Sequence, residues 1–369
     1  MVRRLRALLV AAGLLLGSVA ASAAPTEVVD ALGRKVTVEL PARRLVVNFN
    51  FEEFTAVAGV GGWQKVVGIS RTAWEGWRPA IFKRYTAVVP NLAAMPDIGL
   101  IEDGSFSAEK LIALKPDVFL LADWMYTALG SERERIEAAG IPIVVIDYNA
   151  QILERHLAST RALGKITGSE ERAEELATFY ERQYRDVLAR VAKAAVPRKP
   201  RTYVEVGPDG AETMGVSYAT TMWGKILTLL GSQNIAVGKL AGASGRMNPE
   251  AVIAADPEAI FIAGSSWANK PKAVKTWYDM APEQTRASLA PYAGRAGWAD
   301  LTAVRTGNVN AIEHGLSRSL FDFVAMQYIG KRLYPQAFAD VDPEASFRAY
   351  HEKYLPVAYS GTWMLALKP

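Results

Sequence analysis

Short runs of apolar, β-branched residues alternate along this chain with amphipathic stretches. The apolar runs occupy 45–49, 65–69 and 141–146, and they return at 202–206 and 308–312. Stretches with helical spacing lie between them. Strands that alternate with helices predict an α/β fold with mostly parallel sheets. The segment 71–92 is different, because its Trp, Tyr and Pro residues follow no clean period, and we expect a loop with short helical turns there.

One helix–strand segment occurs twice. Residues 107–122 align without a gap on 248–263, and Glu109 matches Glu250. Each copy has the pattern of a short capped helix, a Pro-containing turn and a buried strand. Two copies of one unit predict two similar lobes, and a ligand usually binds in the cleft between such lobes.

A single long amphipathic helix is predicted between the two lobes. From Ser169 to Lys193, apolar residues fall on one face at 3.6-residue spacing, and a Pro-rich stretch follows. The chain is therefore expected to form an N-terminal α/β lobe, a connecting helix, and a C-terminal α/β lobe with a helical tail: 25–168, 169–196 and 197–369.

Residues 1–24 have the features of a secretory signal peptide. Arg3, Arg4 and Arg6 precede an apolar stretch, and small residues around Ala23 fit a cleavage site. Removal of this segment would lower the formal net charge from +4 to +1, so the basic composition gives no argument for nucleic-acid binding. No later stretch is long and apolar enough to span a bilayer. We expect a periplasmic protein that is not embedded in the membrane.

Cysteine is absent from the 369 residues. Its absence excludes thiolate metal ligands, cysteine nucleophiles and a lipid on an N-terminal cysteine, so we expect no lipoprotein. Histidine is limited to His156, His314 and His351, and a bare metal site needs three or four ligands. We expect no protein metal site and no cofactor. The sequence also lacks a nucleophile elbow and a P-loop, so an enzyme is only a distant alternative.

Several stretches, taken in order, resemble the class III periplasmic binding proteins of ABC importers, which bind ferric siderophores, haem, cobalamin and other metal chelates. The stretches that carry the resemblance are 29–36 with 41–45, 109–117, 248–257 and 298–309. The resemblance implies two α/β lobes joined by one long helix, with a ligand cleft between them and small lobe motions. It also implies a monomer that captures a metal chelate and delivers it to an inner-membrane ABC permease. A ferric siderophore is the first expectation, and haem, cobalamin and other metal chelates remain open.

The matched acids Glu109 and Glu250 are candidates for permease docking. Asn248 and Ser107 are predicted N-caps, which places each acid in the first turn of a helix. The helix dipole alone favours an acid there by about 0.3–1 kcal/mol. The resemblance implies a further role, in which each carboxylate pairs with an arginine of one permease subunit.

Candidate ligand-binding residues follow the predicted strands, because the cleft should lie at the carboxyl ends of the strands. They are rich in aromatic rings, which suit a bulky organic ligand, and in arginines, which suit oxygen atoms around a metal. For haem, Tyr126, Tyr218 and His314 are the candidate axial ligands. The full set comprises Asn48, Asn50, Phe51, Arg71, Trp74, Trp124 and Tyr126 in the first lobe, and Tyr218, Trp267, His314 and Arg318 in the second.

Overall fold

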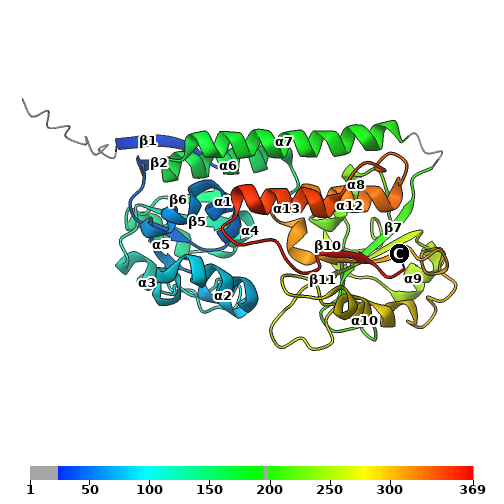
Figure 1. The fold of residues 1–369 in the computed structure, drawn as a ribbon. Coiled ribbons are helices and arrows are strands. Elements are labelled where there is room, and N and C mark those ends of the chain that lie inside the picture. Colours follow the sequence, from blue (N-terminus) through cyan, green and yellow to red (C-terminus); the bar gives the residue numbers. More distant parts are fainter. Residues whose placement is uncertain (1–23, 195–197, 369) are drawn as a thin grey trace, which may run out of the picture.

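Two α/β lobes lie side by side along one long helix in the computed structural model, which describes residues 24–194 and 198–368 (Figure 1). The predicted fold class is confirmed. The signal-peptide prediction for 1–24 falls outside the described residues except at its last position.

The N-terminal lobe is built on a parallel sheet with strand order β4-β3-β5-β6. Its strands are apolar and almost entirely buried, as expected of a parallel sheet with both faces covered. They are β3 (Leu45–Val47), β4 (Val66–Ile69), β5 (Val118–Ala122) and β6 (Ile143–Ile146). An antiparallel hairpin precedes them, β1 (Ala24–Val29) with β2 (Lys35–Leu40). The helices are α1 (Phe51–Gly62), α2 (Pro79–Val88), α3 (Ala108–Ala113), α4 (Asp123–Ala128), α5 (Glu132–Ala138) and α6 (Leu153–Thr167).

The C-terminal lobe repeats this arrangement. Its sheet has the order β13-β12-β11-β7-β9, and all pairs are parallel except β12 with β13. The strands are β7 (Arg201–Val206), β9 (Gln233–Asn234), β11 (Ala259–Gly264), β12 (Val309–Glu313) and β13 (Met364–Ala366). A separate ribbon pairs β8 (Val216–Tyr218) with β10 (Ser244–Arg246). The helices are α8 (Trp223–Leu229), α9 (Pro249–Ala255), α10 (Pro282–Ala293), α11 (Thr302–Arg305), α12 (Asp322–Leu333) and α13 (Pro343–Tyr354).

The duplicated sequence segment folds as the duplication predicts. The first copy forms α3 and β5, and the second forms α9 and β11. Both β5 and β11 lie inside their sheets, flanked on each side by a parallel strand. The repeat therefore marks the same structural unit at the centre of each lobe.

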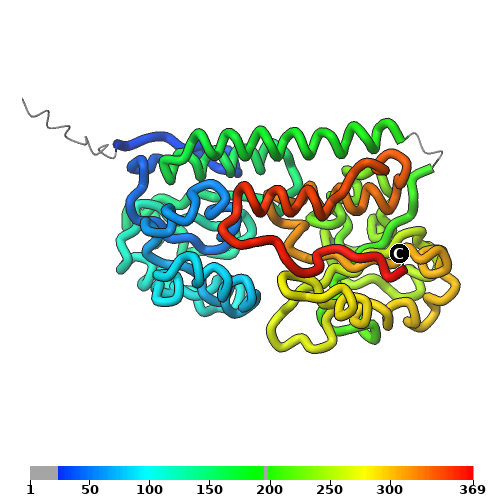
Figure 2. The backbone as a smooth tube through the Cα atoms, viewed as in Figure 1, coloured from blue at the N-terminus to red at the C-terminus, as the bar shows by residue number. Residues whose placement is uncertain are grey.

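The long helix α7 (Glu170–Lys193) connects the lobes, as predicted. It begins after Gly168, whose positive φ of 72° ends α6 in the left-handed conformation that glycine adopts without strain. Its buried face includes Leu176, Tyr180 and Val187. The helix runs over both lobes, and α12 and α13 follow it from the second lobe back towards the first (Figure 2).

Two predictions about local structure were wrong. The segment 71–92 is not a loop throughout, because Pro79 begins the ten-residue helix α2, in which Ile81, Phe82 and Tyr85 form the buried face. The C-terminal tail is also not only helical, as predicted, since it contains the strand β13, which pairs with β12. Helix α2 packs Phe82 and Tyr85 on the nearby Trp74, whereas β13 depends on a partner strand more than fifty residues earlier in the chain.

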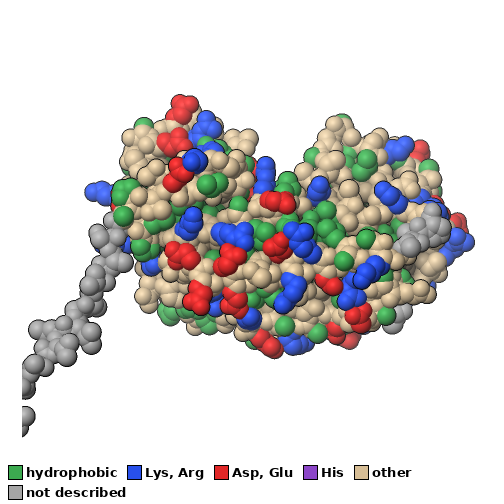
Figure 3. All heavy atoms as spheres, turned by 90° about the horizontal axis from the view of Figure 1, so that it is seen from above, with side chains coloured by type: hydrophobic (Ala, Val, Ile, Leu, Met, Phe, Trp, Pro, Cys, Tyr) green, Lys and Arg blue, Asp and Glu red, His purple; other side chains and the backbone are tan. Residues whose placement is uncertain are grey.

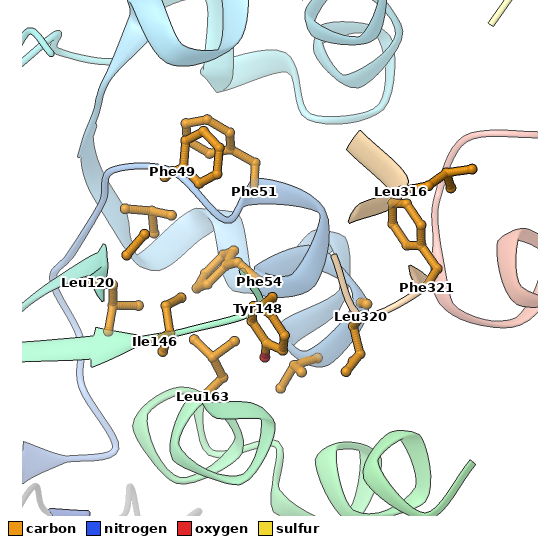
Figure 4. Close-up of a cluster of buried hydrophobic side chains, with 14 of the residues drawn as sticks. Phe49, Phe51, Phe54, Leu120, Ile146, Tyr148, Leu163, Leu316, Leu320 and Phe321 are labelled. Carbon is orange, nitrogen blue, oxygen red and sulfur yellow. The ribbon is translucent and has the colours of Figure 1, made fainter. Parts of the chain in front are cut away.

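The two lobes share one hydrophobic core at their junction. Leu320 and Phe321 of the second lobe belong to the same buried cluster as Phe54 and Tyr148 of the first (Figure 4). The backbone N–H of Leu320 also donates to Glu53 Oε1 at 3.2 Å. The surface is hollowed between the lobes on one side and continuous on the other (Figure 3). The lobes are therefore joined by packing as well as by α7.

This shared core predicts cooperative unfolding. Replacing Phe321 with Ala removes a ring that packs on Phe347 and Tyr350 of α13, and we expect a loss of about 3–5 kcal/mol in the free energy of unfolding. Val237→Ala, at a side chain that is 55% exposed, should change it by less than about 0.5 kcal/mol. Urea titrations followed by circular dichroism and by tryptophan fluorescence should give one coincident transition. Two separate transitions would show that the lobes fold independently.

Candidate functional site

A cavity of about 440 Å³ lies between the lobes, within the usual size range of small-molecule sites. Most of its wall comes from the second lobe, and Gly76 and Trp77 come from the first. The second-lobe residues are Val206, Pro208, Asp209, Gly210, Thr213, Met214, Gly215, Val216, Tyr218, Arg246, Trp267, Ala268, Lys270, His314 and Arg318.

Aromatic rings form a large part of this wall. Trp77, Tyr218 and Trp267 line the cavity, each of them only partly buried. The ring of His314 lies among them, with its centroid 6.0 Å from that of Trp267 and 6.3 Å from that of Tyr218. Such a wall can contact the flat or bulky apolar surface of an organic ligand.

The charges that line the cavity are mainly positive. Lys270 Nζ lies 2.8 Å from Asp209 Oδ1, so these two charges largely compensate each other. Arg246 and Arg318 also line the cavity. Neither forms an ion pair among residues 24–194 and 198–368, although the charge of the nearby Glu313 acts on Arg318. Two guanidinium groups that form no ion pair favour an anionic ligand.

Arg318 lies where the two lobes meet. Its guanidinium carbon lies 5.4 Å from the ring centroid of Phe49, and that of Arg78 lies 5.8 Å from the same ring. The two cations therefore come from different lobes and share one aromatic ring. Arg78 is compensated by Glu52, with Nη1 to Oε2 at 2.8 Å in a buried ion pair. Burial, followed by repulsion from Arg78, lowers the pKa of Arg318.

Buried carboxyl groups lie near these arginines. Burial raises the pKa of Glu313 to about 8. Burial and the neighbouring charge of Glu52 raise the pKa of Glu53 to about 7. Glu313 ends β12, and its Oε2 accepts the backbone N–H of Leu316 at 3.2 Å. The junction beside the cavity therefore contains acids that bind protons readily near neutral pH.

His314 is held by an aromatic neighbour. The indole N–H of Trp223 donates to His314 Nδ1 at 3.1 Å. Burial, together with the charge of Arg318, lowers the pKa of His314 well below its ordinary value, so the imidazole is neutral at pH 7. The residue is only 8% exposed.

The cavity brings together four of the predicted ligand-binding residues, namely Tyr218, Trp267, His314 and Arg318. All four are on the second lobe. The candidates predicted from the first lobe are outside its lining, which on that side consists of Gly76 and Trp77.

Two of those first-lobe candidates are core residues. Phe51 and Trp74 are fully buried and stack on each other with ring centroids 4.2 Å apart. A position just after a strand predicts which edge of the sheet a residue occupies, but not which way its side chain points. Arg71 forms its hydrogen bonds within its own lobe, where its Nη2 donates to the backbone oxygens of Ala93 and Met95.

The remaining first-lobe candidates lie at the junction or further away. Asn48 and Asn50 are buried, and Asn50 lines a small crevice at the base of the junction. Trp124 is half-buried and packs edge-on against Phe49 at 5.3 Å. Tyr126 accepts a hydrogen bond from Arg34 Nη1 at 2.5 Å, beside the β1–β2 hairpin.

Several cavity residues were absent from the predicted set, among them Trp77, Arg246 and Lys270. Trp77 lies in the segment predicted as a loop, directly before α2, and its aromatic character was the signal that could have found it. Arg246 ends β10, whose Ser-Gly-Arg sequence carries no strand pattern. Lys270 follows β11 in a loop, where its position alone gives no indication of the cavity.

The sequence profile of the periplasmic binding protein family matches residues 47–314, which is more than half of the chain. The chain belongs to this family. The predicted resemblance to class III binding proteins of ABC importers is confirmed, and the family implies a small-molecule ligand, a permease partner and a location outside the cytoplasm.

Individual relatives agree with this assignment. The crystal structure of the TroA-like periplasmic binding protein FepB from Veillonella parvula is 36% identical, with a TM-score of 0.87, and the match covers 93% of this chain and 100% of that chain. The molybdate-binding protein MolA of Haemophilus influenzae is 23% identical over 96% of this chain and 98% of its own length. YvrC of Bacillus subtilis, an uncharacterized ABC transporter substrate-binding lipoprotein, is 22% identical over 86% of this chain and 88% of its own length.

The two candidate docking acids occupy equivalent positions in the two lobes. Glu109 is in the first turn of α3 and Glu250 in the first turn of α9. The predicted N-caps are present, since the side chains of Ser107 and Asn248 accept backbone N–H groups of these turns. Glu109 forms an exposed ion pair with Arg135 at 2.8 Å. Glu250 is exposed and has no ion-pair partner among the described residues.

Two further observations concern metals and membranes. Within 24–194 and 198–368, no group of three or more His, Cys, Asp or Glu side chains is arranged to hold a metal ion. In the same residues, no helix is long and apolar enough to cross a membrane.

The raised carboxyl pKa values predict that stability falls as the pH rises. The folded-state pKa values of Glu53, Glu313 and Asp322 are about 7, 8 and 8, above their ordinary values, so the folded protein binds more protons than the unfolded chain in this range. Their stabilising contribution is complete below about pH 4 and is lost as the pH rises through 7–8. We expect the free energy of unfolding to decrease between pH 5.5 and 8.5.

Glu313→Gln should make this decrease shallower, because it removes one of the three groups. Glu39→Gln, at an exposed position on β2, should leave the slope unchanged. Urea unfolding at several pH values measures the slope, and equal slopes for both variants would contradict the assignment.

Proposed function

We propose that this protein captures an anionic metal chelate, a ferric siderophore first, in the periplasm and delivers it to an inner-membrane ABC permease. The observation that carries the proposal is the cavity, which combines an aromatic wall with Arg246 and Arg318, two guanidinium groups that form no ion pair among the described residues. A ferric chelate with an organic scaffold and anionic oxygens complements both features.

Other parts of the proposal follow from the same site. The protein needs no cofactor and no catalytic group for this role, so we propose a monomeric carrier and not an enzyme. The chain has no cysteine, which favours a carrier free in the periplasm over a lipoprotein such as YvrC. Haem, cobalamin and other chelates are the alternatives. The likeness to MolA adds molybdate, although an aromatic-walled cavity of about 440 Å³ suits a larger ligand better.

Tryptophan fluorescence tests the ligand class. The mature protein is titrated with a ferric tris-catecholate, ferric citrate, haem, cobalamin, sodium molybdate and free ferric salt. We expect saturable quenching by a ferric chelate and none by free metal, because Trp77 and Trp267 line the cavity. Response to free metal alone, or to none of these compounds, would contradict the proposal.

Matched variants locate the binding site. Trp267→Phe should reduce the quenching and weaken binding about three- to tenfold, since it removes part of an aromatic contact. Trp124→Phe is the comparison, because Trp124 is also half-buried but lies outside the cavity lining. If Trp124→Phe has the larger effect, the ligand contacts the first lobe at the predicted residue Trp124, and the assignment to this cavity is wrong.

The docking role of Glu109 and Glu250 requires a transport measurement. The double variant Glu109→Ala with Glu250→Ala should lower chelate uptake at least about tenfold and leave chelate affinity unchanged, because neither residue lines the cavity. Glu132→Ala with Glu283→Ala is the matched control, since these acids occupy the first turns of α5 and α10. Uptake that remains intact in the first variant would rule out the docking role.

A further inference from the structure

The three histidines of this chain have different hydrogen-bond environments, and these determine which ring nitrogen carries the proton. An indole N–H can only donate, so His314 Nδ1, which lies 3.1 Å from Trp223 Nε1, must be the acceptor. A neutral imidazole carries one proton, and the remaining nitrogen of His314 must therefore be a donor. That nitrogen, Nε2, has no hydrogen-bond partner among residues 24–194 and 198–368, and the residue lines the cavity.

The other two histidines show the opposite arrangement. His351 Nδ1 lies 2.9 Å from the backbone oxygen of Phe347, which can only accept, so Nδ1 is protonated. His156 Nδ1 lies 2.7 Å from the Tyr180 hydroxyl, whose own proton is donated to Asp322 at 3.0 Å. The His156 Nδ1 must then donate to that hydroxyl oxygen. His314 is thus the one described histidine whose Nε2 carries the proton.

We propose that His314 meets the ligand as a neutral N–H donor through Nε2, that Trp223 positions it for this role, and that His314 is not a metal ligand. A metal ligand needs a free nitrogen lone pair, and the lone pair of this ring is already engaged by Trp223. Arg318, also in the cavity wall, offers only donors as well. The ligand group that fits this pair is an anionic oxygen at the periphery of the ligand, with the metal's coordination sites filled by the chelator itself.

The nature of the ligand in this inference depends on the proposed function, whereas the protonation of His314 does not. A long-range proton–nitrogen correlation NMR spectrum of the isotope-labelled, ligand-free protein at pH 7 tests the protonation directly. We expect two histidines with protonated Nδ1 and one with protonated Nε2, and His314→Gln should remove the latter. A protonated Nδ1 or a doubly protonated ring at His314 would overturn the inference.

Trp223→Phe tests the positioning role. It keeps a ring in place but removes the indole N–H, so the Nδ1 resonance of His314 should shift while those of His156 and His351 stay unchanged. A merely structural role for Trp223 would leave the Nδ1 resonance of His314 where it is in the wild-type protein, and that result contradicts the proposal.

Binding of a ferric tris-catecholate tests how His314 meets the ligand. His314→Leu removes the donor, and we expect about a tenfold or greater loss of affinity. His314→Gln restores an N–H donor at a similar position and should recover affinity to within about threefold of wild type. The visible charge-transfer band of the bound complex should be the same in the wild type and both variants, because the metal's own ligands do not change.

Several outcomes would overturn this assignment. One is a loss in His314→Gln as large as in His314→Leu, accompanied by a shifted absorption band, because that indicates coordination by the imidazole. Another is haem binding with a low-spin spectrum that His314→Leu abolishes. If the wild-type protein binds no ferric chelate, the proposed function fails and the ligand assignment fails with it, while the NMR result for the ligand-free protein separately decides the protonation of His314.

Discussion

The apolar junction between the lobes is the constraint on which the rest of this structure depends. Helix α7 alone would link the two lobes at one place only. Leu320 and Phe321 of the second lobe add a second link, because they lie in the same core as Phe54 and Tyr148 of the first. Arg84 of α2 adds polar contacts across the junction, with Asp279 and Ser360. Large opening of the lobes would expose this core to water. A binding protein built in this way must recognise its ligand with a cavity that is largely formed in advance.

The preformed cavity is asymmetric, and the asymmetry assigns different tasks to the two lobes. The second lobe supplies nearly all of the wall, including its unpaired arginine charges. The first lobe contributes Trp77, which lies three residues after Trp74, and Trp74 is fully buried in the core. Trp77 rests against Phe49 at 6.5 Å, so the contact that reaches across to the second lobe has a rigid base. A small shift between the lobes would therefore move one aromatic contact and leave the rest of the wall intact.

Features set by local pattern could be predicted from the sequence. The strands, the long helix and the duplicated unit depend on spacing and on buried apolar runs, and all are present in the structure. The site could be predicted only in part. Trp267, His314 and Arg318 were found because they follow strands of the second lobe. Tyr218, which is the last residue of β8, was found because it comes after the predicted strand 202–206. The same reasoning selected Phe51, which points into the core, since a strand end indicates an edge of the sheet and not a side-chain direction.

Other site features depend on contacts between residues far apart in the chain. Arg246 lies on β10, which exists as a strand because it pairs with β8 and not because its own sequence favours one. The orientation of His314 depends on Trp223, which is 91 positions away. No pattern within either segment carries that information, so spatial proximity alone reveals it.

The antiparallel pairing of β13 with β12 has a consequence for how the protein is made. Asn310 pairs with Ala366, so the second sheet acquires its covering edge strand only after nearly every other residue of this sequence has been synthesised. Until then β12 presents unpaired backbone groups, which are a template for wrong pairing. A chain that crosses the membrane from its N-terminus to its C-terminus would complete its second lobe last.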